Sequence, residues 1–129
     1  MKLGFIGTGT ITTSVIEGLL KSKAKIGQIN ISKRSKKNSL KLRKKSKKIK
    51  VYLENQDIID KSSIIFVGLL PKVATKELKI CKFKKGQIIV SFVSTLNIKN
   101  LKTLCNPAKV IIKAAPLPVS YTHLTLPTK

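Results

Sequence analysis

The chain has 129 residues, 42% of them hydrophobic, which suits one domain with a core of its own. Its 27 basic and 5 acidic residues give a net charge of +22. Such an excess favours a polyanionic partner, but a base-biased genome would also enrich Lys, Ile and Asn, whose codons are AT-rich. The chain has no Trp and few aromatic residues, so nucleic acid is not the expected partner. Without an apolar run of about eighteen residues or a signal-like segment, we expect a cytoplasmic protein and no membrane span.

Apolar runs alternate with helix-like stretches along the whole chain. The expected strands, in chain order, are Lys2–Ile6, Ile26–Ser32, Val51–Leu53, Ser63–Val67, Gln87–Val93 and Lys109–Lys113. The helices expected between them are Thr10–Lys21, Lys36–Lys47, Gln56–Lys61, Lys72–Cys81 and Ile98–Leu104. This alternation predicts the α/β class, as a Rossmann-like parallel sheet with helices on both faces. The continuous apolar run "IIFVG" is typical of a strand covered on both faces.

The expected core follows from the same periodicity. The first helix should bury one face, made of Ile11, Val15, Ile16, Leu19 and Leu20. The lysine-rich second helix has few apolar residues, and we expect Leu40 to be its chief anchor. Cys81 and Cys105 have no metal-binding spacing, so we expect reduced, mostly buried thiols and no metal site.

The turn after the first strand reads Gly7-Thr8-Gly9-Thr10-Ile11-Thr12 and opens the first helix. A dinucleotide fingerprint requires this strand–turn–helix context. Gly7 would allow the tight turn, Gly9 would let a pyrophosphate approach the backbone, and the first amides of the helix would face the phosphates. Thr12 stands where the fingerprint has a third glycine or alanine, so we expect looser helix–strand packing there. The alternative is a plain tight turn with no ligand.

The end of the second strand indicates which dinucleotide fits. NAD sites usually place Asp or Glu there to hold the ribose hydroxyls. This chain has Ser32-Lys33-Arg34-Ser35-Lys36 instead, without an acid. Arginine binds phosphate through two donors, and Arg34 is one of only two arginines in the chain. We therefore expect NADP (NADPH) as cofactor, although basic residues are common throughout this sequence.

Several segments, in order and at matching intervals over residues 1–118, resemble the amino-terminal half of the pyrroline-5-carboxylate reductase family. They are "GFIGTGTIT", "ISKRS", "NQDIIDKSSIIFVGLLPK", "GQIIVSFVSTLNIKNLKTL" and "VIIKAAPLP". Members of this family transfer a hydride from NADPH to a cyclic imine and make proline. The resemblance implies a cofactor site formed by Gly7, Thr8, Gly9, Thr10 and Ile11 at the pyrophosphate, Arg34 and Ser35 at the 2′-phosphate, Asn55 on the adenosine side, and Leu69, Leu70 and Pro71 along the nicotinamide end.

The sequence also departs from the family pattern. Leu70 replaces a usual lysine, and Leu117-Pro118 replaces the Asn-Thr of a later turn, which leaves the substrate and the catalytic residues unknown. The resemblance further implies a helical carboxy-terminal dimerisation domain after residue 118. We therefore expect residues 1–118 to be the NADP-binding domain of a homo-oligomeric reductase, inactive without its second domain.

Residues 119–129 have a different character. "VSYTHLTLPT" equals the translation of a transposon-type sequencing adapter, so we expect this tail, with His123, to be non-native.

Two alternatives to a reductase of this family stay open. One is another NADP-linked Rossmann family, such as the β-hydroxyacid dehydrogenase-like proteins. The other is a basic Rossmann module that binds nucleic acid through its lysines.

Overall fold

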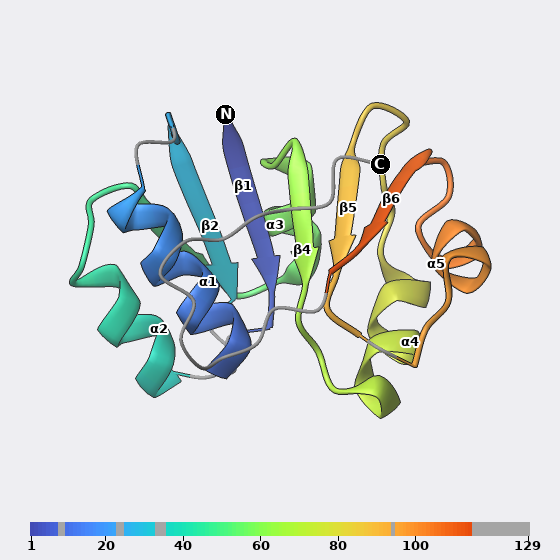
Figure 1. The fold of residues 1–129 in the computed structure, drawn as a ribbon, viewed down its shortest axis with the longest axis horizontal. Helices are drawn as coiled ribbons and strands as arrows, with labels where there is room; N and C mark the ends of the chain where they lie inside the picture. Colours follow the sequence, from blue (N-terminus) through green and yellow to red (C-terminus); the bar gives the residue numbers. More distant parts are fainter. Residues whose placement is uncertain (8–9, 23–24, 33–35, 94, 115–129) are drawn as a thin grey trace.

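The computed structural model describes residues 1–7, 10–22, 25–32, 36–93 and 95–114, with the backbone alone at residues 10, 11 and 36–38. Six strands form a single parallel sheet with helices on both faces (Figure 1). The strands are β1 (Lys2–Ile6), β2 (Gln28–Ser32), β3 (Ile49–Tyr52), β4 (Ile64–Val67), β5 (Ile88–Ser91) and β6 (Val110–Lys113). The predicted Rossmann-like α/β class is confirmed.

The strand order is β3-β2-β1-β4-β5-β6, and every neighbouring pair is parallel. The chain therefore builds outward from β1 to β3, returns to the middle and builds outward again from β4. In open parallel sheets, ligands bind at the carboxyl ends of the strands where the order reverses. Here that switch point lies between β1 and β4, at the lower edge of the sheet in Figure 1.

The helices follow the same division. Helices α1 (Thr10–Lys21) and α2 (Lys36–Arg43) pack on one face, and α3 (Asn55–Asp60), α4 (Pro71–Ile80) and α5 (Ile98–Leu104) pack on the other. Parallel crossovers are right-handed, so when successive strands are added in the opposite direction along the sheet, the connecting helices lie on the opposite face.

Two helices begin with residues suited to a helix start. Pro71 opens α4, where its missing N–H is not needed, and the Asn97 side chain caps α5 by accepting a hydrogen bond from the Asn100 N–H at 2.8 Å.

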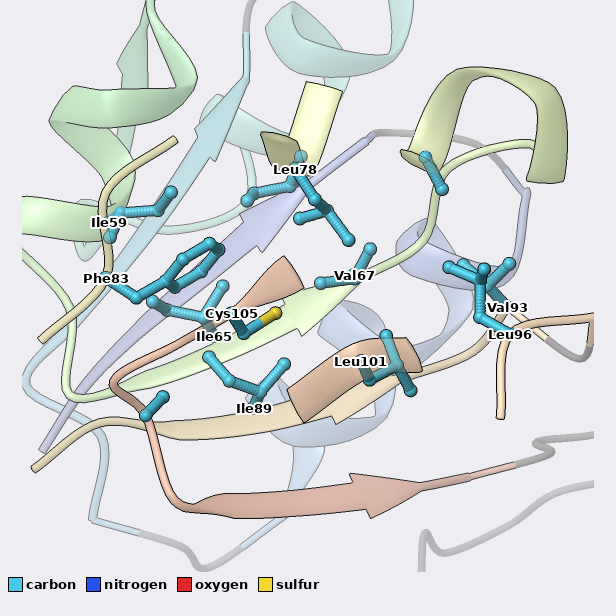
Figure 2. Packing of buried hydrophobic residues seen from close by; sticks show 13 residues of the cluster. Ile59, Ile65, Val67, Leu78, Phe83, Ile89, Val93, Leu96, Leu101 and Cys105 are labelled. Carbon is cyan, nitrogen blue, oxygen red and sulfur yellow. The ribbon is translucent and has the colours of Figure 1, made fainter. Parts of the chain in front are cut away.

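Two buried apolar clusters hold the layers together. Figure 2 shows the first, in which Leu78 of α4 and Leu101 of α5 pack against Ile65, Val67 and Ile89 of the sheet. Side chains alternate across a strand, so Phe66 faces the opposite cluster, together with Val15 and Ile16 of α1. Strand β4 is thus covered on both faces, as its continuous apolar run predicts.

The second cluster is centred on two aromatic rings of adjacent strands. Phe5 and Phe66 are opposite each other in the β1–β4 register. Their rings stack with centroids 4.5 Å apart and planes inclined by 7°. Such a pair adds about 0.5–1.5 kcal/mol beyond the area it buries, so it strengthens the contact between the two strands that flank the switch point.

The predicted elements are all present; β1, α1 and α5 have the expected bounds, and the ends of the others differ. Helix α2 ends at Arg43 rather than Lys47, and β3 begins at Ile49, two residues earlier than expected. The expectation that Leu40 anchors α2 is wrong, because Leu40 is 48% exposed whereas Leu42 is fully buried. The inward face is set by Ser39, which donates a hydrogen bond to the Ser32 carbonyl, and by Leu42 three residues later.

Candidate cofactor site

The site begins with Gly7, which follows β1 directly at the switch point. Its φ is +97°, a value that side-chain-bearing residues rarely adopt. A Cβ added at Gly7 would lie 2.6 Å from the carbonyl oxygen of Gly68, the residue that follows β4. The Gly68 N–H donates to the Ile6 carbonyl at 2.9 Å. The backbone at the end of β4 can therefore approach Gly7 closely because Gly7 has no side chain.

Helix α1 starts three residues after Gly7, at Thr10, and runs for 12 residues. Its first turn contains no acidic residue, so no carboxylate of that turn neutralises the positive end of the helix dipole. Free N–H groups at such a helix start favour anions, phosphates in particular. Thr8 and Gly9 lie outside the described residues, and Thr10 and Ile11 are described by their backbone alone.

The packing of Thr12 differs from what its size suggests. Thr12 is 1% exposed, and a Cβ added at Gly68 would overlap with its Oγ1. The extra bulk of Thr12 thus occupies the space that Gly68 leaves by lacking a side chain. The expectation of looser helix–strand packing is wrong, because Gly68, which has no side chain, leaves room for the threonine.

The segment that follows β4 forms the other wall of the switch point. Leu69 packs against the first core cluster, and its Cδ2 would lie 3.3 Å from a Cβ at Gly7. Leu70 is 73% exposed, and its carbonyl accepts the N–H groups of Val73 and Ala74. Pro71 is the first residue of α4. Three of the predicted site positions, Leu69 to Pro71, therefore run from the buried end of β4 out to solvent beside the glycine turn.

Asn55 lies in a second part of the same edge. It is the first residue of α3 and lines a hollow of about 330 Å³ beyond the ends of β2 and β3. The hollow is lined by Ser32, Leu53, Glu54, Asn55, Gln56, Glu77, Ile80 and Cys81. The Nδ2 of Asn55 donates a hydrogen bond to Oε2 of Glu77 in α4 at 3.2 Å. Most of these side chains are polar, two of them carboxylates, and Leu53, Ile80 and Cys81 supply the apolar part of the lining.

The two cysteines are free, as predicted, and neither is an activated nucleophile. Burial, and next the negative charge of Glu77, raise the pKa of the Cys81 thiol to about 11. Burial, and next Cys81, raise the pKa of Cys105 to about 12. Both thiols therefore stay protonated at neutral pH, and Cys105 contributes to the first core cluster instead.

Two predicted positions, Arg34 and Ser35, lie outside the described residues, as does His123. Two further residues of the site, Gly68 and Glu77, are not predicted from the sequence. Gly68 carries a visible signal, a glycine at the end of the buried run "IIFVG". Glu77 carries none, because its bond to Asn55 joins helices whose residues are 22 positions apart.

The described residues fit a dinucleotide. A glycine turn with positive φ, an adjoining helix start and a separate small hollow follow one another along the carboxyl edge of the sheet. This sheet order and turn define the class of Rossmann-type dinucleotide-binding domains.

No helix in the described part of the chain has the length and apolar character needed to cross a bilayer.

The comparison with known families makes the assignment more specific. Residues 2–95 match the family described as NADP oxidoreductase, coenzyme F420-dependent, and the chain belongs to this family. The chain is also 29% identical over 119 residues to pyrroline-5-carboxylate reductase 3 of Danio rerio, across 90% of its own length and 41% of that relative. The resemblance to pyrroline-5-carboxylate reductases seen in the sequence is thereby confirmed.

Solved structures support the same fold. A pyrroline-5-carboxylate reductase from Streptococcus pyogenes is 24% identical with a TM-score of 0.71, covering 88% of this chain and 41% of that one. A pyrroline carboxylate reductase from Plasmodium falciparum, solved with NADP bound, is 22% identical with a TM-score of 0.72 and the same coverage. This chain therefore spans about two fifths of the length of these relatives.

Proposed function

We propose that this chain is the NADP-binding domain of a reductase that transfers a hydride from NADPH to a cyclic imine. The glycine turn at the β1–β4 switch point carries the proposal, because it presents a helix start where a dinucleotide binds in this fold. The relative from Danio rerio, a pyrroline-5-carboxylate reductase, supports the imine as substrate class and proline biosynthesis as the role. The cofactor supplies the hydride chemistry, and the protein binds and orients it.

The proposed cofactor contacts follow the edge of the sheet. Gly7, Thr8, Gly9, Thr10 and Ile11 hold the pyrophosphate; Arg34 and Ser35 hold the 2′-phosphate; Asn55 holds the adenosine side; and Leu69, Leu70 and Pro71 lie along the nicotinamide end. The absence of an acid in the sequence from Ser32 to Lys36 favours NADP over NAD. We assign no catalytic residue.

Cofactor titration of the full-length gene product tests this proposal. NADPH is expected to bind more tightly than NADH. Gly9→Asp should abolish binding, because a carboxylate would face the pyrophosphate. Arg34→Ala should weaken NADPH binding about tenfold or more and leave NADH nearly unchanged, since a hydrogen bond to a charged group contributes about 1.5–3 kcal/mol.

The chain offers a matched control in Arg43, its other arginine, which is exposed on α2. Arg43→Ala should leave both affinities unchanged. Tighter binding of NADH than NADPH by the unmodified protein, or equal losses for both cofactors in Arg34→Ala, would contradict the assignment.

We also propose that the cofactor domain ends near residue 118 and that a helical domain, which forms the homo-oligomer, follows it in the native protein. Residues 119–129 would then be foreign sequence. Reading the genomic DNA without interruption past the codon for Leu117 checks this. Native codons for "VSYTHLTLPT" at that place would refute the foreign origin of residues 119–129.

A further inference from the structure

From the contact between Asn55 and Glu77 we infer that Glu77 is a positioning residue for the cofactor, which it orients through Asn55. The inference rests on the proposed function, because it assigns Asn55 to the adenosine side of a bound dinucleotide. Glu77 lies on α4, in a part of the chain that neither the glycine turn nor the basic loop includes.

The hydrogen bond fixes which way the Asn55 amide faces. An ionised carboxylate accepts hydrogen bonds and donates none, so the group turned toward Glu77 Oε2 must be the amide nitrogen. The carbonyl Oδ1 then occupies the opposite branch of the planar amide and is the acceptor. Glu77 thus converts a side chain with two interchangeable ends into one with a defined acceptor.

The hollow around this pair suits the adenosine half of a dinucleotide. Its volume of about 330 Å³ is at the lower end of the range for ligand pockets. Leu53 and Ile80, each about three-quarters exposed, supply apolar surface for a flat base. An adenosine carries hydroxyl and amine donors, and the oriented Oδ1 of Asn55 accepts from a donor of this kind.

The direction in which NADPH affinity changes when Glu77 is removed distinguishes a positioning role from a purely electrostatic one. Glu77 is negative, and NADPH is a polyanion. If Glu77 acted through its charge alone, removing that charge would tighten NADPH binding. If Glu77 orients Asn55, removing it allows the amide to rotate and weakens binding.

The test measures the Kd for NADPH of Glu77→Ala, Asn55→Ala and the double variant in the full-length gene product. Glu77→Ala should raise Kd about three- to tenfold, the effect of one misdirected hydrogen bond. The double variant should bind no more weakly than Asn55→Ala, because Glu77 acts through Asn55. Glu77→Gln should give a Kd between those of Glu77→Ala and the unmodified protein, since its amide can both accept and donate and so no longer requires the Asn55 nitrogen to face it.

Two controls distinguish positioning from a change in charge and from a loss of structure. Glu54→Ala deletes a second carboxylate of the same hollow, one that is not the acceptor for Asn55, and it should leave Kd unchanged or slightly lower. Reduced nicotinamide mononucleotide lacks the adenosine half, so its Kd should be the same in Glu77→Ala as in the unmodified protein. A general loss of structure would weaken both ligands.

The outcomes separate this inference from the proposed function. If the unmodified protein does not bind NADPH, the proposed function fails and the inference fails with it. If it binds NADPH but Glu77→Ala binds equally or more tightly, only the inference is overturned. Losses that multiply in the double variant would also overturn it, because Glu77 would then act independently of Asn55.

Discussion

Single residues at the switch point show how backbone geometry selects the side chain. Gly7 has a φ of +97° and faces the Gly68 carbonyl, so two separate physical reasons exclude a side chain there. The fingerprint predicts the first reason. The second depends on the end of a strand that is distant in sequence, which the local pattern does not reveal.

Gly7→Ala should destabilise the protein by about 1–3 kcal/mol, because the left-handed backbone and the contact with the Gly68 carbonyl both oppose a methyl group. The free energy of unfolding in urea measures this. Gly18→Ala is the control. A Cβ at Gly18 meets nothing within 4 Å, and alanine in a helix is more favourable than glycine by about 1 kcal/mol. Equal stabilities of the two variants would argue against the strained turn.

At the scale of elements, the packing of α1 on the sheet depends on two residues of complementary size. Thr12 of α1 is buried against Gly68 at the end of β4. The opposite face of the sheet has a similar contact. A Cβ at Gly4 of β1 would overlap with the side chains of Ser62 and of Ile58, and Ile58 belongs to α3. At these two contacts a glycine leaves the space that a side chain packed against it occupies.

Gly68→Ala should destabilise the protein by about 1–3 kcal/mol, because the new methyl group would overlap with Thr12. In a Thr12→Ala background the same change should be nearly neutral, since the hydroxyl that it meets is gone. Urea unfolding of the two single variants and the double variant gives the coupling energy, expected at about 1 kcal/mol or more. Additive effects would show that the two sites do not compete for space.

At the scale of the whole molecule, the charge of +22 is the dominant feature. Exposed basic residues gather at the end of α2 and directly after it, among them Arg43, Lys44, Lys47 and Lys48. Lys45 pairs with Glu17 of α1 at 3.2 Å, a partly exposed bridge of small energetic weight. The fold is therefore held by its two apolar clusters against the repulsion of its surface charges.

Sodium chloride should raise the melting temperature of this protein. Between about 0.01 M and 1 M salt the Debye length falls from roughly 30 Å to 3 Å, which screens the repulsion between lysines. The double variant Lys47→Glu, Lys48→Glu has a lower net charge and should gain less from the same salt. Differential scanning calorimetry measures both proteins. A melting temperature that does not change with salt would show that the surface repulsion is energetically unimportant.

The class of the fold, the order of its elements and the position of the glycine turn could be predicted from the sequence. These features depend on local patterns, namely apolar periodicity and a turn that needs glycine, and such patterns are legible within a few residues. The sequence also supported the family through motifs such as "GFIGTGTIT", which the comparisons confirm. The inward face of α2 was less predictable, because it depends on contacts with the sheet: Leu42 rather than Leu40 is buried, and Ser39 bonds to the Ser32 carbonyl of β2.

Tertiary structure alone decided the contacts between distant segments. It paired Thr12 with Gly68, and it brought Glu77 to Asn55. Both contacts arise where the parallel sheet collects the ends of strands and helices from separate parts of the chain. A linear pattern records the spacing of neighbours along the chain, whereas complementary volume and a shared hydrogen bond exist only after the sheet has formed.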